Sequence, residues 1–135
     1  MLIPLSATGE WWNVNVQPAL AKGALNIVGA KGRALGTFAI NDKSIRINPT
    51  FTISFDICSD VKQKVTVMAV CKFGVKNELY SQSVEIVGGK WERVICEMSN
   101  FHRVSDGKQL ADKETVGMFV ILSDNEFIVN NVLLV

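Results

Sequence analysis

The stretch TFTISFDIC, residues 50–58, decides the fold class, because its apolar and polar side chains alternate strictly. The apolar phase holds Phe51, Ile53, Phe55 and Ile57, and the polar phase holds Thr52, Ser54 and Asp56. A period of two places successive side chains on opposite faces of an extended chain. The stretch therefore predicts a β-strand with one buried face and one polar face.

Similar alternating runs follow toward the C-terminus. KVTVMAVCKF (64–73) comes after a polar turn, ELYSQSVEIV (78–87) follows the segment 74–77, and WERVICEM (91–98) follows Gly88-Gly89. A Gly-Gly pair supplies the positive φ angles of a tight hairpin. We therefore expect these strands to form a meander with the strand at 50–58. VGMFVILS (116–123) and EFIVNNVLLV (126–135) flank a further turn pair, Asp124-Asn125.

The N-terminal third adds shorter runs, WNVNV (12–16), ALNIVG (24–29) and ALGTFAI (34–40), separated by Pro18, Gly23 and Lys31-Gly32-Arg33. Residues 99–115 form a long irregular connection, in which we expect a short helical turn at 109–113. About nine short strands at a spacing of about ten residues predict an antiparallel β-sandwich, with a jelly roll as the topology. The prediction is one all-β domain over residues 1–135.

Composition narrows the function classes. The 135 residues carry 14 basic and 13 acidic side chains, a net charge of +1. The basic residues are scattered, so we expect no nucleic-acid partner. No run approaches the roughly 18 apolar residues of a membrane span, and the N-terminus lacks the pattern of a signal peptide. We expect either a protein that stays where it is made or a module of a longer chain.

The three cysteines, Cys58, Cys71 and Cys96, lie inside apolar alternating runs and show no CxxC spacing. They are expected to be buried free thiols. If residues 59–64 turn the chain back on itself, Cys71 lies on the order of 20 Å along the strand from Cys58, too far for a disulfide.

Catalytic signatures are weak. His102, the one histidine, lies in the 99–115 connection, and no G-x-S-x-G motif provides a nucleophile. The acidic residues nearest one another, such as Asp56 with Asp60, show no shared apolar pocket. No cluster of His and Cys has metal-ligand spacing. We therefore predict a protein that is not an enzyme and needs no cofactor.

Three motifs resemble a known family. INPTFTISFDICSD (47–60) resembles the Y-x-L-S-F-D-x-x-S strand of jelly-roll carbohydrate-binding modules. GGKWERVICEMSNF (88–101) resembles their W-x-R-V strand, and NEFIVNNVLLV (125–135) resembles their last strand, F-x-I-D-D-V-x-L. The resemblance implies a non-catalytic module that binds polysaccharide or oligosaccharide and belongs to a larger chain. Such modules are appended to polysaccharide-degrading enzymes, and similar ones are inserted in bacteriophage tail and baseplate proteins.

The sequence departs from this family at Asn130-Asn131, where acidic residues are common. In many such modules an aspartate near this position helps to hold a structural calcium ion. Amide oxygens are neutral and weaker ligands for a hard cation. A structural calcium therefore stays open as an alternative to a metal-free module.

Sugar recognition needs an aromatic platform and a few rigid hydrogen-bonding groups. In the segment GEWWNVNV (9–16), Trp12 shares a phase with the valines and is expected in the core, whereas Trp11 shares one with the asparagines and is expected to face outward. The alternative is that both indoles pack in an irregular entry. Trp91 is expected mainly to pack, and Tyr80 either caps the core or stands at the rim.

The predicted ligand-binding residues are chosen by strand face or loop position: Trp11, Asn13, Asp56, Lys72, Tyr80, Gln82, Arg93, His102 and Asp124. With them, the chain is expected to attach a larger protein or a virion to cell-wall or plant polysaccharide. The virion tail and a secreted protein are the two predicted locations. The alternative function is a structural β-sandwich that packs against other subunits and binds no sugar.

Overall fold

The described chain is built almost entirely from β-strands, as predicted. The computed structural model describes residues 11–12, 17–20, 28–37, 45–46, 51–71, 76, 78–110 and 115–134, with side chains from residue 51 onward except at a few positions in the last strand. The elements are β1 (Trp11–Trp12), β2 (Gln17–Leu20), β3 (Val28–Thr37), β4 (Ile45–Arg46), β5 (Thr52–Ser59), β6 (Gln63–Cys71), β7 (Glu78–Ile86), β8 (Trp91–Glu97), the 3-10 turn η2 (Met98–Asn100), β9 (His102–Arg103) and β10 (Thr115–Leu134).

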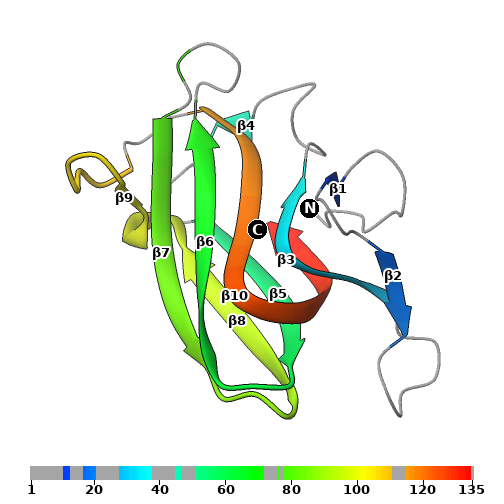
Figure 1. Cartoon of the computed structure of the whole chain (residues 1–135). Helices are drawn as coiled ribbons and strands as arrows, with labels where there is room; N and C mark the ends of the chain where they lie inside the picture. The colour runs from blue at the N-terminus through cyan, green and yellow to red at the C-terminus, as the bar shows by residue number, and fades with distance from the viewer. Residues whose placement is uncertain are drawn as a thin grey trace.

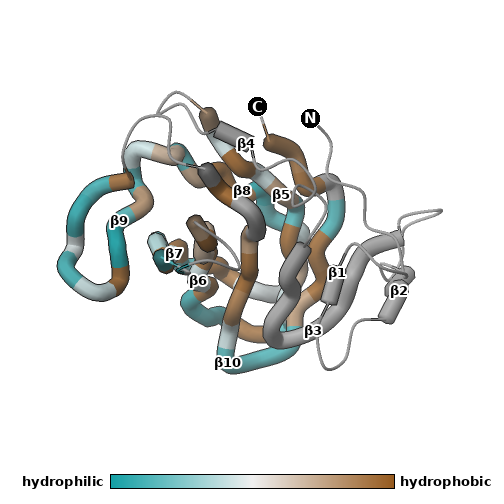
Figure 2. Tube along the Cα trace, turned by 90° about the horizontal axis from the view of Figure 1, so that it is seen from above, coloured by the Kyte–Doolittle hydropathy of each residue, from teal (hydrophilic) through white to brown (hydrophobic). Residues whose placement is uncertain are grey.

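The long strand β10 organises the sheet (Figure 1). Its first part pairs with β6 and its last part pairs with β5, while β3 follows both parts along the other edge. The register shifts between Leu122 and Phe127, where β10 bends. β6 pairs with β7, and β5 pairs with β8, so β10 joins two halves of the sheet. Figure 2 shows from above that the sheet curls so that these halves face each other.

The predicted meander is wrong. β5 pairs with β8, in a register that places Asp56 opposite Arg93, and β6 pairs with β7. The chain therefore crosses from one half to the other at the β5–β6 turn and again at the β7–β8 turn. Gly88 and Gly89 have the expected positive φ, 82° and 74°, but they join strands of opposite halves. Alternation and turn chemistry are the same for a hairpin and for such a crossing, so they do not identify the partner strand.

Two predicted breaks lie inside strands. Lys31-Gly32-Arg33 continues β3, at the place where β10 bends beside it. Pro18 lies within β2, which pairs with β3 and has no second partner among the described strands. An edge strand tolerates proline because it needs no N–H donor on its open side.

The connection between β8 and β10 also differs from the prediction. The helical turn expected at 109–113 does not begin at Gln109, because Gln109 forms a β-bridge with His102. Residues 111–113 of the expected turn lie outside the described residues. The 3-10 turn η2 lies earlier, at Met98–Asn100. In the described ranges no helix is long and apolar enough to cross a membrane.

The core fills the space between the two halves of the sheet. Phe55 is fully buried, as its apolar phase predicted, and so are Phe119 and Phe127 of β10, while Phe51 is partly buried and packs against the core. Phe101, from the irregular connection, is also fully buried, and its ring centroid lies 6.4 Å from that of Phe119. The connection after β8 is therefore tied into the core.

A buried glutamine holds the bend of β10. The Gln63 Nε2 group donates to the Ser59 hydroxyl at 2.8 Å and to the Asn125 carbonyl at 3.2 Å, and the Asn125 N–H donates to Gln63 Oε1 at 3.0 Å. These bonds replace strand pairing where the register shifts. Asp124-Asn125 is thus a bend within one strand, not the predicted turn between two.

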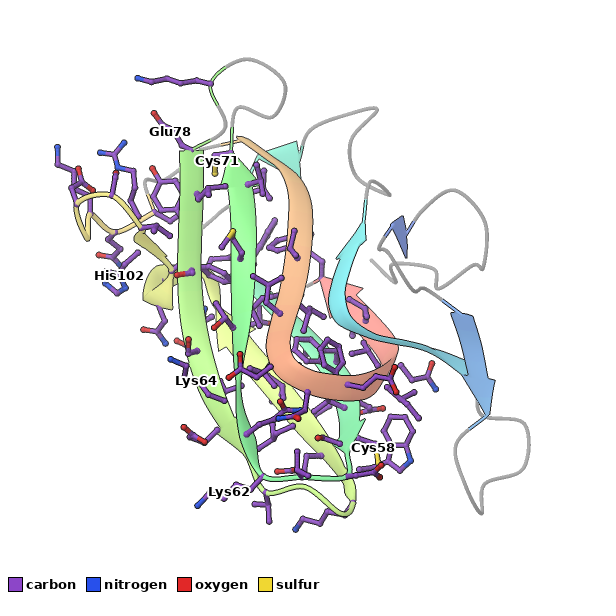
Figure 3. All side chains as sticks on the ribbon, viewed as in Figure 1. Cys58, Lys62, Lys64, Cys71, Glu78 and His102 are labelled. Carbon is purple, nitrogen blue, oxygen red and sulfur yellow. The ribbon has the colours of Figure 1, made fainter. Side chains whose placement is uncertain are left out.

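The three cysteines are free thiols, and Figure 3 shows Cys58 and Cys71 at opposite ends of the sandwich. Cys71 and Cys96 are buried, as predicted, but Cys58 is only half-buried. Burial raises the pKa of Cys96 to about 11. The pKa of Cys58 is also raised, first by partial burial and then by the negative charges of Asp60 and Glu92.

We expect Cys58 to react first when the folded protein meets a disulfide-exchange reagent at mildly alkaline pH. The reactive form is the thiolate, and raising the pKa from 9.0 to about 11 leaves Cys96 with about 100-fold less thiolate than an unshifted thiol. The burial of Cys96 also blocks access by the reagent. Mass spectrometry of alkylated peptides over time measures the order. Labelling of all three thiols at one rate before unfolding would contradict the burial of Cys71 and Cys96.

A candidate carbohydrate-binding surface

The outer face of the β5–β8 half presents an aromatic side chain beside polar ones. Buried positions alternate along both strands, so the intervening side chains point away from the core. We call this face the β5–β8 surface. Its members are Trp91, Arg93 and Ile95 from β8, Ser54, Asp56 and Cys58 from β5, and Ile128 and Asn130 from β10.

The cross-strand pairs order this surface into rows. Cys58 lies between Trp91 and Ile128, which makes an apolar row at one end. Asp56 lies between Arg93 and Asn130, which makes a polar row in the middle. Directly opposed side chains are about 4.5–5.5 Å apart at Cβ, so the members of each row are in reach of one another.

The middle row is held by an ion pair. The Arg93 Nη1 group donates to Asp56 Oδ1 at 3.0 Å, and Nη2 donates to the Ser54 hydroxyl at 2.8 Å. Ser54 is 7% exposed, so the guanidinium lies across β5 and covers it. The two contacts fix the plane of the guanidinium, whose donors form a rigid fork.

The surface is hollowed at its apolar end, and its members range from half-buried to exposed except for Ser54. The hollow holds about 90 Å³ and is lined by Cys58, Ile128 and Phe127, with Asp60 and Glu126 at its rim. Ile95, in the next row beyond the ion pair, is 63% exposed.

The outer face of the other half has a different chemistry. Val70 and Val120 form a small aliphatic cluster there, with Met68 and Leu122 packed against it. Among the described side chains of β6, β7 and β10, none that points outward on this face is aromatic. Among the described side chains, the aromatic platform that sugar recognition needs is therefore offered by Trp91 on the β5–β8 surface.

The structure brings together two of the predicted site residues, Asp56 and Arg93. Tyr80 is 4% exposed and belongs to the core, with its hydroxyl 3.5 Å from Glu78. Gln82 is half-buried and donates to the Glu97 carbonyl at 2.9 Å, a bond that joins the edges of the two halves. Neither side chain lies on the β5–β8 surface.

The remaining predicted residues are scattered. His102 is exposed at the β9 edge, pointing away from the sandwich in Figure 3, and its Nδ1 lies 3.1 Å from the Asn100 carbonyl. Asp124 is exposed at the bend of β10. Trp11 pairs with Thr37 at the end of β3, but its side chain lies outside the described part. Asn13 and Lys72 lie outside the described residues altogether. The roles of Trp11, Asn13 and Lys72 in binding therefore remain predictions.

Nothing in the described residues assembles a metal site. No group of three His, Cys, Asp or Glu side chains there is arranged to hold an ion. Asn130 lies in a strand opposite Asp56, whose carboxylate is engaged by Arg93.

Sequence reasoning missed Ser54, Ile95, Ile128 and Asn130 as members of the surface, and placed Trp91 mainly in packing. A signal was present for Trp91 and Ile95, because both share the phase of Arg93 in WERVICEM. Asn130 joins Asp56 only through the pairing of β10 with β5, a contact that no local pattern contains.

The curled antiparallel sheet with strands crossing between its halves has the jelly-roll fold of carbohydrate-binding modules. No family model and no curated protein sequence matches the chain. Among solved structures, the family 11 carbohydrate-binding module of a cellulosomal cellulase of Clostridium thermocellum is 17% identical, with a TM-score of 0.52 over 93% of this chain and 86% of that one.

Two further structures contain bound saccharide. A family 11 module from Clostridium thermocellum in complex with a β-1,3-1,4-mixed-linked tetrasaccharide is 18% identical, with a TM-score of 0.51 over 90% of this chain and 84% of that one. The CBM22-1 and GH10 modules of a Clostridium thermocellum endo-1,4-β-D-xylanase, complexed with xylohexaose, are 13% identical, with a TM-score of 0.57 over 93% of this chain and 25% of that one. These similarities establish the fold.

Proposed function

We propose that the chain is a non-catalytic carbohydrate-binding module that tethers a larger polypeptide to a polysaccharide. The observation that carries the proposal is the β5–β8 surface, where an indole, an ion pair and an amide share one open sheet face. A pyranose presents apolar C–H groups on its ring faces and hydroxyls at its rim. The surface offers a partner for each, which is the general composition of a saccharide site.

Each side chain has a role in this proposal. Trp91 is the stacking platform at the apolar end. Asp56 accepts hydrogen bonds from sugar hydroxyls, while Arg93 and Asn130 on either side of it donate. Because Arg93 is already fixed by Asp56 and Ser54, little side-chain entropy is lost when a ligand binds. An open row of this kind suits the middle of a polymer chain.

The arrangement also supports binding without chemistry. Glycoside hydrolysis generally uses two carboxyl groups about 5–10 Å apart on either side of the scissile bond. At the centre of the β5–β8 surface, Asp56 is flanked by Arg93 and Asn130, and neither is a carboxylate. The polar row therefore suits recognition.

The partners follow from this function. One is polysaccharide, and the other is the parent chain that the module anchors, as the xylanase structure joins such a module to a GH10 module. A secreted enzyme and a virion tail protein are the two settings in which we place it. In both, weak binding to a repeating polymer gains strength when several modules act together.

A panel of immobilised plant and cell-wall polysaccharides tests the proposal. The expected result is binding to a related set of glycans with micromolar to millimolar affinity, and no reducing sugar released on incubation. A structural module that only packs against other subunits would bind none of them. Release of reducing sugar would contradict the non-catalytic assignment.

We expect Arg93→Ala to weaken binding to the best glycan of the panel by about tenfold or more. Hydrogen bonds to a charged group contribute about 1.5–3 kcal/mol. Stability should change by less than about 1 kcal/mol, because the pair with Asp56 is partly exposed to water. Lys64→Ala is the matched control, since Lys64 is an exposed cation on the outer face of the other half. Isothermal titration calorimetry measures the glycan affinity of both variants. Equal losses of affinity would show a general effect of charge.

A further inference from the structure

A larger pocket lies away from the β5–β8 surface, where the start of β7 meets the loop after β9. It encloses about 490 Å³, within the range of roughly 300–1,000 Å³ usual for small-ligand sites. We call it the β7–β9 pocket. In Figure 3, Glu78, one of its lining residues, lies at the opposite end of the sandwich from Cys58. A ligand in this pocket is therefore separate from one stacked on Trp91.

The walls of the pocket are fixed by an ion-pair network centred on Arg103. Its Nε and Nη2 groups each donate to the Asp106 carboxylate at 2.9 Å, and Nη1 lies 3.5 Å from Glu78. The guanidinium carbon also stands 6.0 Å from the centre of the Tyr80 ring, within the range of a cation–π contact. The network joins the loop, the first residue of β7 and the core.

Backbone bonds hold the loop in the same shape. The Val104 N–H donates to the Leu79 carbonyl at 2.8 Å, and the Arg103 N–H donates to the Lys108 carbonyl at 2.7 Å. Gly107, with φ of 76°, closes the turn by donating to the Arg103 carbonyl at 2.8 Å. A pocket whose walls are fixed in advance loses little entropy when it fills.

The charges around the pocket balance. Lys76 and Arg103 face Glu78 and Asp106, and the Lys76–Glu78 distance is 3.8 Å. The hydrogen bond from Arg103 lowers the pKa of Asp106 and raises that of Arg103, so both stay charged around neutral pH. An ionic ligand would have to break an existing pair, whereas a neutral ligand with hydroxyls leaves the pairs intact.

The remaining lining suits such a ligand. Leu79 is 37% exposed and Val104 is 59% exposed, and together they offer aliphatic surface for the C–H face of a sugar ring. The Ser105 hydroxyl, at the rim, makes no hydrogen bond within the described residues, and Lys76 is largely exposed. Hydroxyls of a ligand can therefore bond at the rim while its ring covers Leu79 and Val104.

We propose that the β7–β9 pocket is a second saccharide site, which takes one or two units at the end of a neutral glycan chain. Its volume of about 490 Å³ is that of a small-ligand site, so it suits the one or two units at a chain end and not a long stretch of polymer. The inference shares its ligand class with the proposed function but rests on different residues.

The test is a titration of the ¹⁵N-labelled protein with cellobiose, xylobiose and glucuronic acid, followed by amide chemical shifts. We expect a neutral disaccharide to shift the amides of Leu79, Val104, Ser105 and Asp106 with millimolar affinity, and glucuronic acid to shift them at least tenfold more weakly. Leu79→Trp should fill the pocket and abolish these shifts. Ser83→Trp, exposed on the same face of β7, is the matched control and should retain them.

The outcomes separate the two sites. Shifts at Trp91 and Arg93 without shifts around Ser105 overturn the second site and leave the proposed function standing. Shifts around Ser105 alone support the pocket and contradict the β5–β8 surface. Preference for glucuronic acid, or unchanged shifts in Leu79→Trp, overturns the inference. The spectrum of each variant reports its folding, and Val104→Asp, in an exposed loop position, repeats the test without altering a strand.

Discussion

Gly88→Ala is expected to destabilise the protein by more than about 3 kcal/mol. A Cβ at this position would lie 2.4 Å from the Val61 carbonyl carbon, 2.6 Å from the Val61 oxygen and 2.7 Å from the Lys62 nitrogen. All three are backbone atoms of the β5–β6 turn, so no side-chain rotation relieves the clash. The left-handed φ of 82° adds about 1–2 kcal/mol for any residue with a Cβ. The change forces apart the two turns by which the chain crosses between the halves of the sheet.

Gly89→Ala is the control for Gly88→Ala. Gly89 has a similar φ of 74°, but a Cβ there would meet nothing within 4 Å. The cost should be the conformational one alone, about 1–2 kcal/mol. Urea unfolding followed by tryptophan fluorescence gives both free energies. Equal losses for the two variants would contradict the close approach of the turns.

The same turn shows what the sequence could reveal about the fold. Strict alternation in residues 50–58 and 91–98 was enough to predict strands with one buried face, and Gly88-Gly89 was enough to predict positive φ. The partner of each strand was not predictable in this way. Pairing of β5 with β8 joins residues such as Asp56 and Arg93 that are 37 positions apart, and it depends on how both halves bury their apolar faces together.

The candidate site was predictable to the extent that it depends on the phase of a strand. Asp56 and Arg93 were chosen because they point away from the apolar phase, and both do. Tyr80 and Gln82 share the inward phase of β7, and their final positions depend on what covers that edge. Arg103, from the long connection that has no period, covers the Tyr80 ring, and the Glu97 carbonyl at the end of β8 accepts from Gln82.

Trp91→Ala should remove most glycan binding, with a loss of at least about 2 kcal/mol, or about 30-fold in affinity. The indole is the described aromatic side chain of the β5–β8 surface, and it lies opposite Cys58 beside the apolar hollow. Without it the C–H face of the sugar has only small aliphatic groups to cover. Trp91→Phe retains a flat ring and should recover much of the affinity. Affinity electrophoresis in the best polysaccharide of the panel measures all three proteins.

Comparison with Trp11→Ala decides between two platforms, because the sequence alone favours Trp11 as the outward indole and Trp12 as its buried neighbour. If Trp91 is the platform, Trp11→Ala leaves binding unchanged while Trp91→Ala abolishes it, and unfolding by urea shows that both variants remain folded. Trp12→Ala should instead cost about 3–5 kcal/mol in stability if its indole is in the core. Loss of binding in Trp11→Ala with full binding in Trp91→Ala would move the site from the β5–β8 surface to the β1 edge. Loss in both would mean that a single glycan chain contacts the two indoles.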